Sequence, residues 1–194
     1  MPDGPFLVSF LVSSALGELN MVASALGLRS ITFGATDEHA YPDDGLKVYY
    51  AARVLDSDSA RPHLQHLEAA QKQLDEYFRG TRHSFALNLD LTASHPGDKR
   101  VGSPFRRRVW LALQEIPYGG TSSYGNLARA VSSPGAARAV GTACAKNPLP
   151  IVLPCHRVVR ADGKMGNYTG GREIKAALLA LEAKSLGAHS AEIR

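Results

Sequence analysis

The first quarter of the chain alternates between short apolar or β-branched runs and turn-forming residues. The apolar runs cover four segments, residues 6–12, 19–23, 28–33 and 46–54. Glycines at 17, 27 and 34 and a Tyr-Pro-Asp-Asp-Gly turn at 41–45 separate them. Short runs bounded by turn residues predict a small antiparallel sheet.

A helical pattern follows from about residue 59 to 79. Leu64, Leu67, Leu74 and Phe78 fall on one face, Pro62 lies near the start, and a glycine follows the end. This spacing is that of an amphipathic helix with ordinary start and stop residues. We expect the helix to cover the predicted sheet.

Residues 92–102 are polar and show no hydrophobic periodicity, which is typical of a linker. The charge balance also changes here. Residues 1–98 hold 7 Lys and Arg against 13 Asp and Glu, whereas residues 99–194 hold 15 against 5. The sequence therefore predicts an N-terminal domain (1–91), a linker (92–102) and a C-terminal domain (103–194).

The C-terminal part is predicted to be mostly helical. Ser103 and Pro104 are suited to begin a helix that stops before Pro117. Two short helices, at about 123–131 and 135–146, then flank a tight turn, as in a helix-turn-helix motif. That pattern is weak, because many helical hairpins never contact DNA.

The second short helix is built almost entirely of small residues. Small side chains offer little to read base edges in a major groove, but they let a backbone approach a narrow minor groove. Tight packing in a core explains the same composition equally well. Arg138 stands alone among them and is either a surface charge or a probe.

The basic half of the chain points to a polyanionic partner, with nucleic acid ahead of a membrane because no basic amphipathic stripe accompanies the charge. A solvated basic face is the alternative. No run approaches the roughly 20 apolar residues of a membrane span. The apolar stretch 5–16 lacks the basic start of a signal peptide. A soluble, cytoplasmic protein is expected.

The chain has two cysteines, Cys144 and Cys155, which are too few for a disulfide scaffold and suit a reducing compartment. Two thiols cannot complete a four-ligand zinc site, and the histidines are scattered, so we expect no metal. Prolines at 148, 150 and 154 frame an apolar run that we interpret as a strand before Cys155.

The neighbours of Cys155 predict a reactive thiol. His156 and Arg157 place it in a positive field that favours the thiolate and lowers its pKa. Strand geometry would point the Cys155 and His156 side chains apart, so a bridging water is the expected link between them. By itself, a Cys-His pair is more often a buried structural thiol than a catalyst.

Pro154-Cys155-His156-Arg157-Val158 resembles the active-site signature of the O6-alkylguanine-DNA alkyltransferases, also called methylated-DNA–protein-cysteine methyltransferases. The resemblance continues through motifs in the family's order and spacing: 116–119, 123–125, 138–141, 147–148, 166–171, Lys175 and 178–182. It is nearly complete over residues 103–183. Over residues 1–91 it is looser and rests on 16–19, 27–28 and 74–80.

The resemblance implies an α+β protein with two domains. The N-terminal one would be a ribonuclease H-like sheet with its covering helix. The C-terminal one would be mostly helical and winged-helix-like, with a helix-turn-helix and an active-site cysteine. The implied function is DNA repair by irreversible, stoichiometric transfer of an alkyl group from O6 of guanine, and from O4 of thymine, to Cys155. The implied partner is double-stranded DNA bound through its minor groove, with no cofactor, no obligate protein partner and a monomeric protein.

The resemblance also implies roles for the residues that perform the transfer. Cys155 is the acceptor, His156 takes its proton through a water, and Glu182 orients the imidazole, as in other nucleophiles activated by a base. Asn147 braces the turn that carries Cys155. Tyr124 donates a hydrogen bond to N3 of the guanine.

Further residues are implied to bind the base and the DNA. Main-chain groups of Cys155 and Val158 read the base edge, and Thr169 lies near O6. Arg138 fills the space left in the duplex when the damaged nucleotide is flipped out. The remaining implied contacts are Ala137 and Gly141, which allow close approach, Pro150 and Tyr168, which wall the pocket, and Arg157. Cys144 either competes as a nucleophile or packs as a small apolar residue, and we favour packing.

Three other functions compete with this one. A papain-like cysteine hydrolase would place its histidine far from the cysteine in the sequence. A non-catalytic damage sensor on the same scaffold would lack the acceptor cysteine. A helix-turn-helix regulator would need polar readers on its second helix, where residues 135–145 offer only Arg138 and Thr142.

Overall fold

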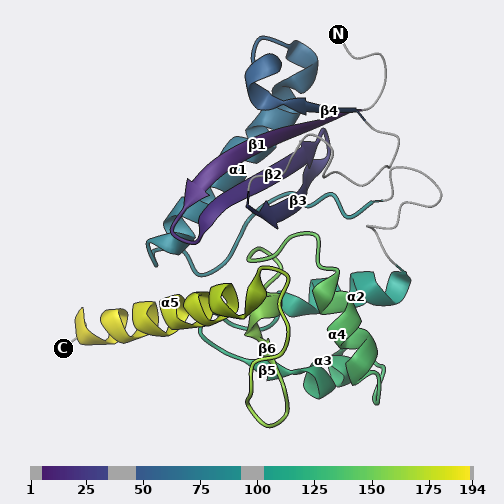
Figure 1. The fold of residues 1–194 in the computed structure, drawn as a ribbon, viewed down its shortest axis with the longest axis vertical. Coiled ribbons are helices and arrows are strands. Elements are labelled where there is room, and N and C mark those ends of the chain that lie inside the picture. The colour runs from purple at the N-terminus through teal and green to yellow at the C-terminus, as the bar shows by residue number, and fades with distance from the viewer. Residues whose placement is uncertain (1–5, 35–46, 93–102, 193–194) are drawn as a thin grey trace. The chain divides into compact units, whose positions relative to one another are not determined.

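The computed structural model describes residues 6–34, 47–92 and 103–192, with side chains up to residue 187 (Figure 1). The chain divides into two compact units, Met1–Val101 and Gly102–Arg194. The fold is α+β, with a small sheet in the first unit and mostly helices in the second, as predicted. No helix in the described ranges is long and apolar enough to cross a membrane.

The N-terminal unit contains a sheet of strand order β3-β2-β1-β4. Strands β1 (Phe6–Ser14), β2 (Gly17–Ser24) and β3 (Gly27–Phe33) form an antiparallel meander. Strand β4 (Lys47–Tyr50) pairs parallel to β1, so the prediction of a wholly antiparallel sheet is wrong for this strand. A parallel pair needs a long crossover connection, and apolar patterning does not show strand direction.

The fourth apolar run also ends earlier than predicted. The chain leaves β4 after Tyr50 and turns into a 3₁₀ helix at Ala51–Arg53. The predicted turn at 41–45 lies outside the described residues.

Helix α1 (Arg61–Phe78) confirms the predicted amphipathic helix and packs on β1, β2 and β3 (Figure 1). A 3₁₀ turn at Asp58–Ala60 precedes it, and Pro62 occupies its first turn, where the missing N–H is not needed. Its buried face is His63, Leu67, Ala70, Leu74 and Tyr77. The helix therefore supplies one side of the core of this unit.

Residues 88–92 attach the end of the N-terminal unit to the edge of β3. Leu28 N donates to Asn88 O at 2.8 Å, and Asp90 N donates to Leu28 O at 2.9 Å. The buried Asp90 carboxylate accepts from Arg29 Nη1 at 2.7 Å and from Ser24 Oγ at 2.6 Å. The predicted linker begins at Thr92, and its remainder, 93–102, lies outside the described residues.

Three helices of the C-terminal unit pack on one another: α2 (Pro104–Leu113), α3 (Tyr124–Ala130) and α4 (Ala137–Ala145). Ser103 caps α2 by accepting from Arg106 N at 3.4 Å, as predicted. The buried Trp110 of α2 donates from Nε1 to Ala143 O of α4 at 2.8 Å. This bond fixes the helix of small residues against its neighbour.

The rest of the unit connects the site to a long helix. Strands β5 (Ser122–Ser123) and β6 (Val158–Val159) form a short parallel pair. Helix α5 (Gly171–Glu192) follows and extends to the end of the described chain (Figure 1).

The strand predicted before Cys155 is absent from the described structure. Residues 148–153 form turns instead, with Leu153 N donating to Leu149 O at 2.8 Å and Ile151 at a φ of 75°. Three prolines remove backbone donors and fix φ, so the run cannot pair as a strand although residues 149–158 are buried. Cys155–Arg157 form a 3₁₀ turn, so the argument from alternating strand side chains fails as well.

Candidate functional site

The sulfur of Cys155 is buried inside the C-terminal unit and is held by Asn147. Only 3% of Cys155 is exposed, and its Sγ accepts from Asn147 Nδ2 at 3.1 Å. The same amide nitrogen donates to Leu153 O at 2.7 Å, while Asn147 Oδ1 accepts from Leu149 N at 3.0 Å. One buried side chain thus ties the turn at 149–153 to the sulfur.

Burial raises the pKa of Cys155 to about 11, although the hydrogen bond from Asn147 and the charge of Lys175 act in the opposite direction. The expectation of a lowered thiol pKa is therefore wrong for this structure. That expectation depends on the positive field of Arg157, but the Arg157 guanidinium is bound to the Glu182 carboxylate. The thiol is protonated at neutral pH, so its proton must leave during any reaction at sulfur.

His156 and Glu182 form a fully buried pair. His156 Nε2 lies 2.9 Å from Glu182 Oε1, and neither side chain is exposed. Burial lowers the pKa of His156, with the carboxylate partly opposing this, so the imidazole is neutral. Burial raises the pKa of Glu182, but the bonds from His156 and Arg157 prevail and hold it at about 2. An ionised carboxylate only accepts, so Nε2 carries the hydrogen and Nδ1 is the basic nitrogen.

Glu182 gathers further donors around its carboxylate. Arg157 donates from Nε at 3.1 Å to Oε2 and from Nη2 at 3.0 Å to Oε1, and Gly119 N donates to Oε2 at 2.9 Å. Arg157 Nη1 donates to Ile116 O at 2.6 Å. The assignment of Arg157 to DNA is corrected accordingly. Its guanidinium is buried and serves the carboxylate.

Tyr124, the first residue of α3, lies between α4 and the loop that precedes α5. A Cβ added to Gly141 would lie 3.8 Å from the Tyr124 ring, and one added to Gly166 would lie 2.2 Å from its Oη. Burial raises the Tyr124 pKa, and the thiols of Cys144 and Cys155 raise it further. The phenol is therefore a protonated donor near both sulfurs.

Gly166→Ala tests this packing. The added methyl group must displace the Tyr124 phenol, because the two would overlap, whereas the fold can adjust by moving one ring. We expect the alkyl transfer that the sequence resemblance implies to slow about tenfold, the scale of one lost hydrogen bond, with thermal unfolding nearly unchanged. Gly187→Ala on α5, where a Cβ meets nothing, is the control. Normal transfer by Gly166→Ala would remove Tyr124 from the reaction.

The residues that the resemblance assigns to the base pocket differ in how deeply they are buried. Pro150 is buried, and Tyr168 is half-buried with its ring 6.3 Å from that of His156, edge to face. Thr169 is exposed and donates to Ala145 O at 3.4 Å. Val158 is buried at the start of β6, and its carbonyl accepts from Lys175.

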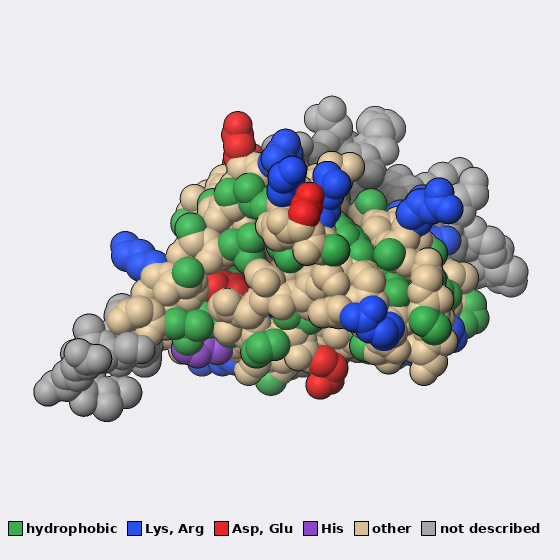
Figure 2. All heavy atoms as spheres, turned by 90° about the horizontal axis from the view of Figure 1, so that it is seen from below, with side chains coloured by type: hydrophobic (Ala, Val, Ile, Leu, Met, Phe, Trp, Pro, Cys, Tyr) green, Lys and Arg blue, Asp and Glu red, His purple; other side chains and the backbone are tan. Residues whose placement is uncertain are grey.

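The outer side of α4 is exposed where the implied DNA contacts lie. Arg138 is exposed, while Ala137 and Gly141 are half-buried. On the inner side Val140, Ala143 and Cys144 are buried. Burial raises the pKa of Cys144 to about 12, which agrees with packing as a neutral thiol. Figure 2 shows one face of the molecule, with Lys and Arg side chains at several places and fewer Asp and Glu.

Sequence reasoning gave no role to three groups that the structure places at the site. The main-chain N–H of Gly119 donates to Glu182, and the carbonyl of Ile116 accepts from Arg157. The ammonium of Lys175 donates to the carbonyl of Val158. Every residue has a main-chain N–H or carbonyl, so the sequence could not predict the contacts of Gly119 and Ile116. Lys175 did carry a signal, because its position three residues before Leu178 places it on the buried face of a helix.

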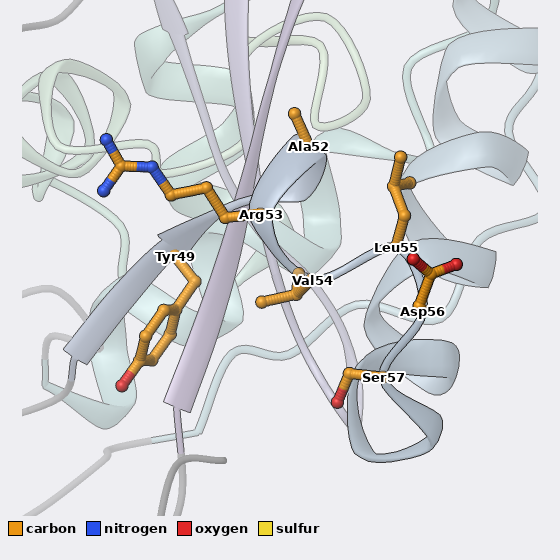
Figure 3. A pocket seen from close by; sticks show the side chains of 7 residues that line it. All are labelled: Tyr49, Ala52, Arg53, Val54, Leu55, Asp56 and Ser57. Carbon is orange, nitrogen blue, oxygen red and sulfur yellow. The ribbon is translucent and has the colours of Figure 1, made fainter.

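A separate hollow of about 390 Å³ lies in the N-terminal unit. In Figure 3 the Arg53 and Asp56 side chains point away from each other. Its lining residues are Tyr49, Ala52, Arg53, Val54, Leu55, Asp56 and Ser57. All of them belong to the N-terminal unit, whereas Cys155, His156 and Glu182 belong to the C-terminal unit, so the hollow is treated separately from this site.

Two family models match the chain in succession. The ribonuclease-like domain of 6-O-methylguanine DNA methyltransferase matches residues 7–91, and the DNA-binding domain matches residues 104–184. A methylated-DNA–protein-cysteine methyltransferase of Mycolicibacterium paratuberculosis is 52% identical over 113 residues. That match covers 58% of this chain and 63% of the relative, so it spans less than two thirds of the relative's length.

Solved structures match along nearly the whole chain. The crystal structure of Mycobacterium tuberculosis OGT in complex with DNA is 33% identical, with a TM-score of 0.70, covering 93% of this chain and 94% of that one. The O6-methylguanine methyltransferase of the same organism is 34% identical, with a TM-score of 0.71 and the same coverage. These matches define a protein of a ribonuclease-like domain followed by a DNA-binding domain. The chain belongs to the 6-O-methylguanine DNA methyltransferase family, whose curated members are named methylated-DNA–protein-cysteine methyltransferases.

Proposed function

We propose that this protein repairs DNA by moving a methyl group from O6 of guanine to Sγ of Cys155. The observation that carries the proposal is a buried thiol held by Asn147, followed in the sequence by a buried, neutral imidazole that Glu182 holds. The S–C bond forms as the bond between the methyl carbon and O6 breaks. Because a thioether does not release its alkyl group to water, each chain acts once.

The proton balance follows from the ionisation states of the site. The Cys155 proton passes to the basic Nδ1 of His156, through a bridging water, as sulfur attacks. Glu182 then stabilises the imidazolium, since its low pKa keeps it ionised. As the bond to O6 breaks, Tyr124 passes its proton to N3 and the guanine leaves as a neutral base; the proton taken up by His156 then restores the Tyr124 phenol through water. Main-chain groups of Cys155 and Val158 and the Thr169 hydroxyl hold the base, with Pro150 and Tyr168 as walls.

The proposed partner is double-stranded DNA, approached through the minor groove by α3 and α4 as a helix-turn-helix. Small residues at Ala137 and Gly141 permit the close approach, and the exposed Arg138 enters the stack as the damaged nucleotide flips out. The matched structure of the M. tuberculosis protein contains DNA. We propose O4-methylthymine as a second substrate. We also propose that the protein is a monomer and that it is located in the cytoplasm, where its two free thiols stay reduced.

Counting transferred methyl groups tests the proposal. We expect one radiolabelled methyl group per chain from excess O6-methylguanine duplex, and no further transfer on adding fresh DNA. Cys155→Ser should accept none. Cys144→Ser, the matched change at the other buried thiol, should still accept one. Several methyl groups released per chain, or acceptance by Cys155→Ser, would contradict the proposal.

A further inference from the structure

The turn between α2 and β5 contacts the Arg157–Glu182 ion pair, and the proposed chemistry gives no role to its tyrosine. Tyr118 is half-buried, and Arg157 Cζ lies over its ring, 5.6 Å from the ring centroid. Nearby in the same turn, Ile116 O accepts from Arg157 Nη1 at 2.6 Å, and Gly119 N donates to Glu182 Oε2 at 2.9 Å. The turn therefore contacts both partners of the ion pair.

The far end of the Tyr118 side chain is fixed to α5. Its hydroxyl is hydrogen-bonded to the side chain of Ser185, which is buried on α5 one turn after Glu182. An aromatic face within about 6 Å of a guanidinium attracts it, most strongly where both groups are desolvated. The Arg157 side chain is buried. The Tyr118 ring is thus placed to hold the guanidinium in one orientation.

The orientation of Arg157 matters because two donors share one carboxylate oxygen. His156 Nε2 lies 2.9 Å from Glu182 Oε1, and Arg157 Nη2 donates to the same oxygen at 3.0 Å. The guanidinium charge also lowers the pKa of His156. If the guanidinium moved away, Oε1 would act on His156 alone and favour the charged imidazolium. A charged imidazole cannot take the proton of Cys155.

We propose that Tyr118 is a positioning residue, whose ring holds the Arg157 guanidinium on the carboxylate and so keeps His156 neutral for the transfer. Two further groups act on the imidazole. The charge of Lys175 on α5 lowers its pKa, and the Tyr168 ring lies edge to face at 6.3 Å. Neither belongs to the turn of Tyr118, so a change there leaves both in place. This inference rests on the proposed function, in which the imidazole accepts the thiol proton.

The test is the pH dependence of single-turnover methyl transfer from free O6-methylguanine, a substrate that leaves DNA binding out of the measurement. The rate should fall on the acid side as His156 becomes protonated. In Tyr118→Leu the midpoint of this fall should move up by about half a pH unit, which is about a threefold lower rate at acid pH, while the rate near pH 8 stays within about twofold of wild type. Tyr118→Met, which also lacks an aromatic face, should show the same shift.

Two matched variants remove the hydroxyl bond and keep the ring over the guanidinium. Tyr118→Phe and Ser185→Ala each break the bond between the two side chains from one end. Both should keep the wild-type midpoint. A loss of stability alone slows transfer without moving the midpoint, so the pH profile separates positioning from packing.

An unchanged midpoint in Tyr118→Leu and Tyr118→Met would overturn the inference and reduce Tyr118 to a packing residue. A shift in Tyr118→Phe as large as that in Tyr118→Leu would overturn it as well, because the ring would then not be what holds the guanidinium. If the wild type transfers no methyl group to Cys155 from free base or duplex, the proposed function fails instead, so the two failures are distinguishable.

Discussion

Glu182→Gln should slow methyl transfer about 10²-fold, the scale of a lost acid–base element. It should also destabilise the C-terminal unit. The fully buried carboxylate accepts from His156, Arg157 and Gly119. A neutral amide leaves the Arg157 guanidinium buried without its counter-charge, which costs about 3–5 kcal/mol. Single-turnover rates and urea unfolding measure the two effects, and DNA affinity should barely change.

A second substitution separates the chemical effect from the structural one. Glu182→Gln combined with Arg157→Met removes the stranded guanidinium, so the double variant should regain much of the unfolding free energy. Transfer should remain slow, because His156 still lacks the carboxylate that stabilises its charged form. If the rate returns together with the stability, Glu182 is only a structural residue. If Glu182→Gln transfers methyl at the normal rate but binds DNA poorly, Glu182 serves DNA binding and not the activation of His156.

The wild type and Glu182→Gln should also differ in how their unfolding free energy depends on pH. The pKa of Glu182 is held at about 2, below its ordinary value of 4.5, so the folded state favours the ionised form. The stability contributed by this group is fully present above about pH 4.5 and is lost as pH falls towards 2. The wild type should therefore lose more unfolding free energy over this interval than Glu182→Gln. Parallel pH curves for the two proteins would contradict the ionised state of Glu182.

Arg138→Ala should strongly depress repair of duplex DNA and leave the reaction with free O6-methylguanine near the wild-type rate. Extruding a stacked nucleotide costs a few kcal/mol, and an arginine in the vacated space offsets part of that cost. A free base needs no extrusion. Arg138 is exposed on α4, so its loss should not disturb the buried site. Both second-order rates are measured in one preparation.

Arg107→Ala is the charge-matched control for this comparison. Arg107 is exposed on α2 and its loss removes the same charge, so any change in duplex repair should be the small one expected for a general phosphate attraction. Equal losses by Arg138→Ala on duplex and free base would mean that Arg138 shapes the pocket or the fold. Equal duplex losses in the two variants would reduce its role to charge alone. Either result removes the flipping role.

Local patterns predicted most of the fold. The meander, the covering helix and the Ser103 cap follow from apolar spacing and turn residues, which are properties of neighbouring residues. The direction of β4 depends on a crossover that apolar patterning does not record. The apolar residues of the run at 149–153 favour a strand, yet Pro148, Pro150 and Pro154 prevent ladder pairing. Burial and strand pairing are separate properties, and composition reports only the first.

The candidate site could be predicted less completely than the fold. The site residues came from sequence motifs, and the structure joins Asn147 to the sulfur of Cys155 and Glu182 to His156. The pKa of the Cys155 thiol could not be predicted from its neighbours in the sequence. Arg157 follows His156 in the sequence, but its guanidinium is bound to a carboxylate 25 residues away. The thiol is therefore governed by burial and not by the neighbouring positive charge.

The proposed reaction ends with a methyl group on the sulfur of Cys155. The most direct measurement is the mass of the intact chain before and after mixing with O6-methylguanine duplex, followed by peptide mapping of the product. We predict a gain of a single methyl in place of the thiol hydrogen, found on the peptide that contains Cys155. An unchanged mass, or a methyl group mainly on the peptide that contains Cys144, would contradict the account.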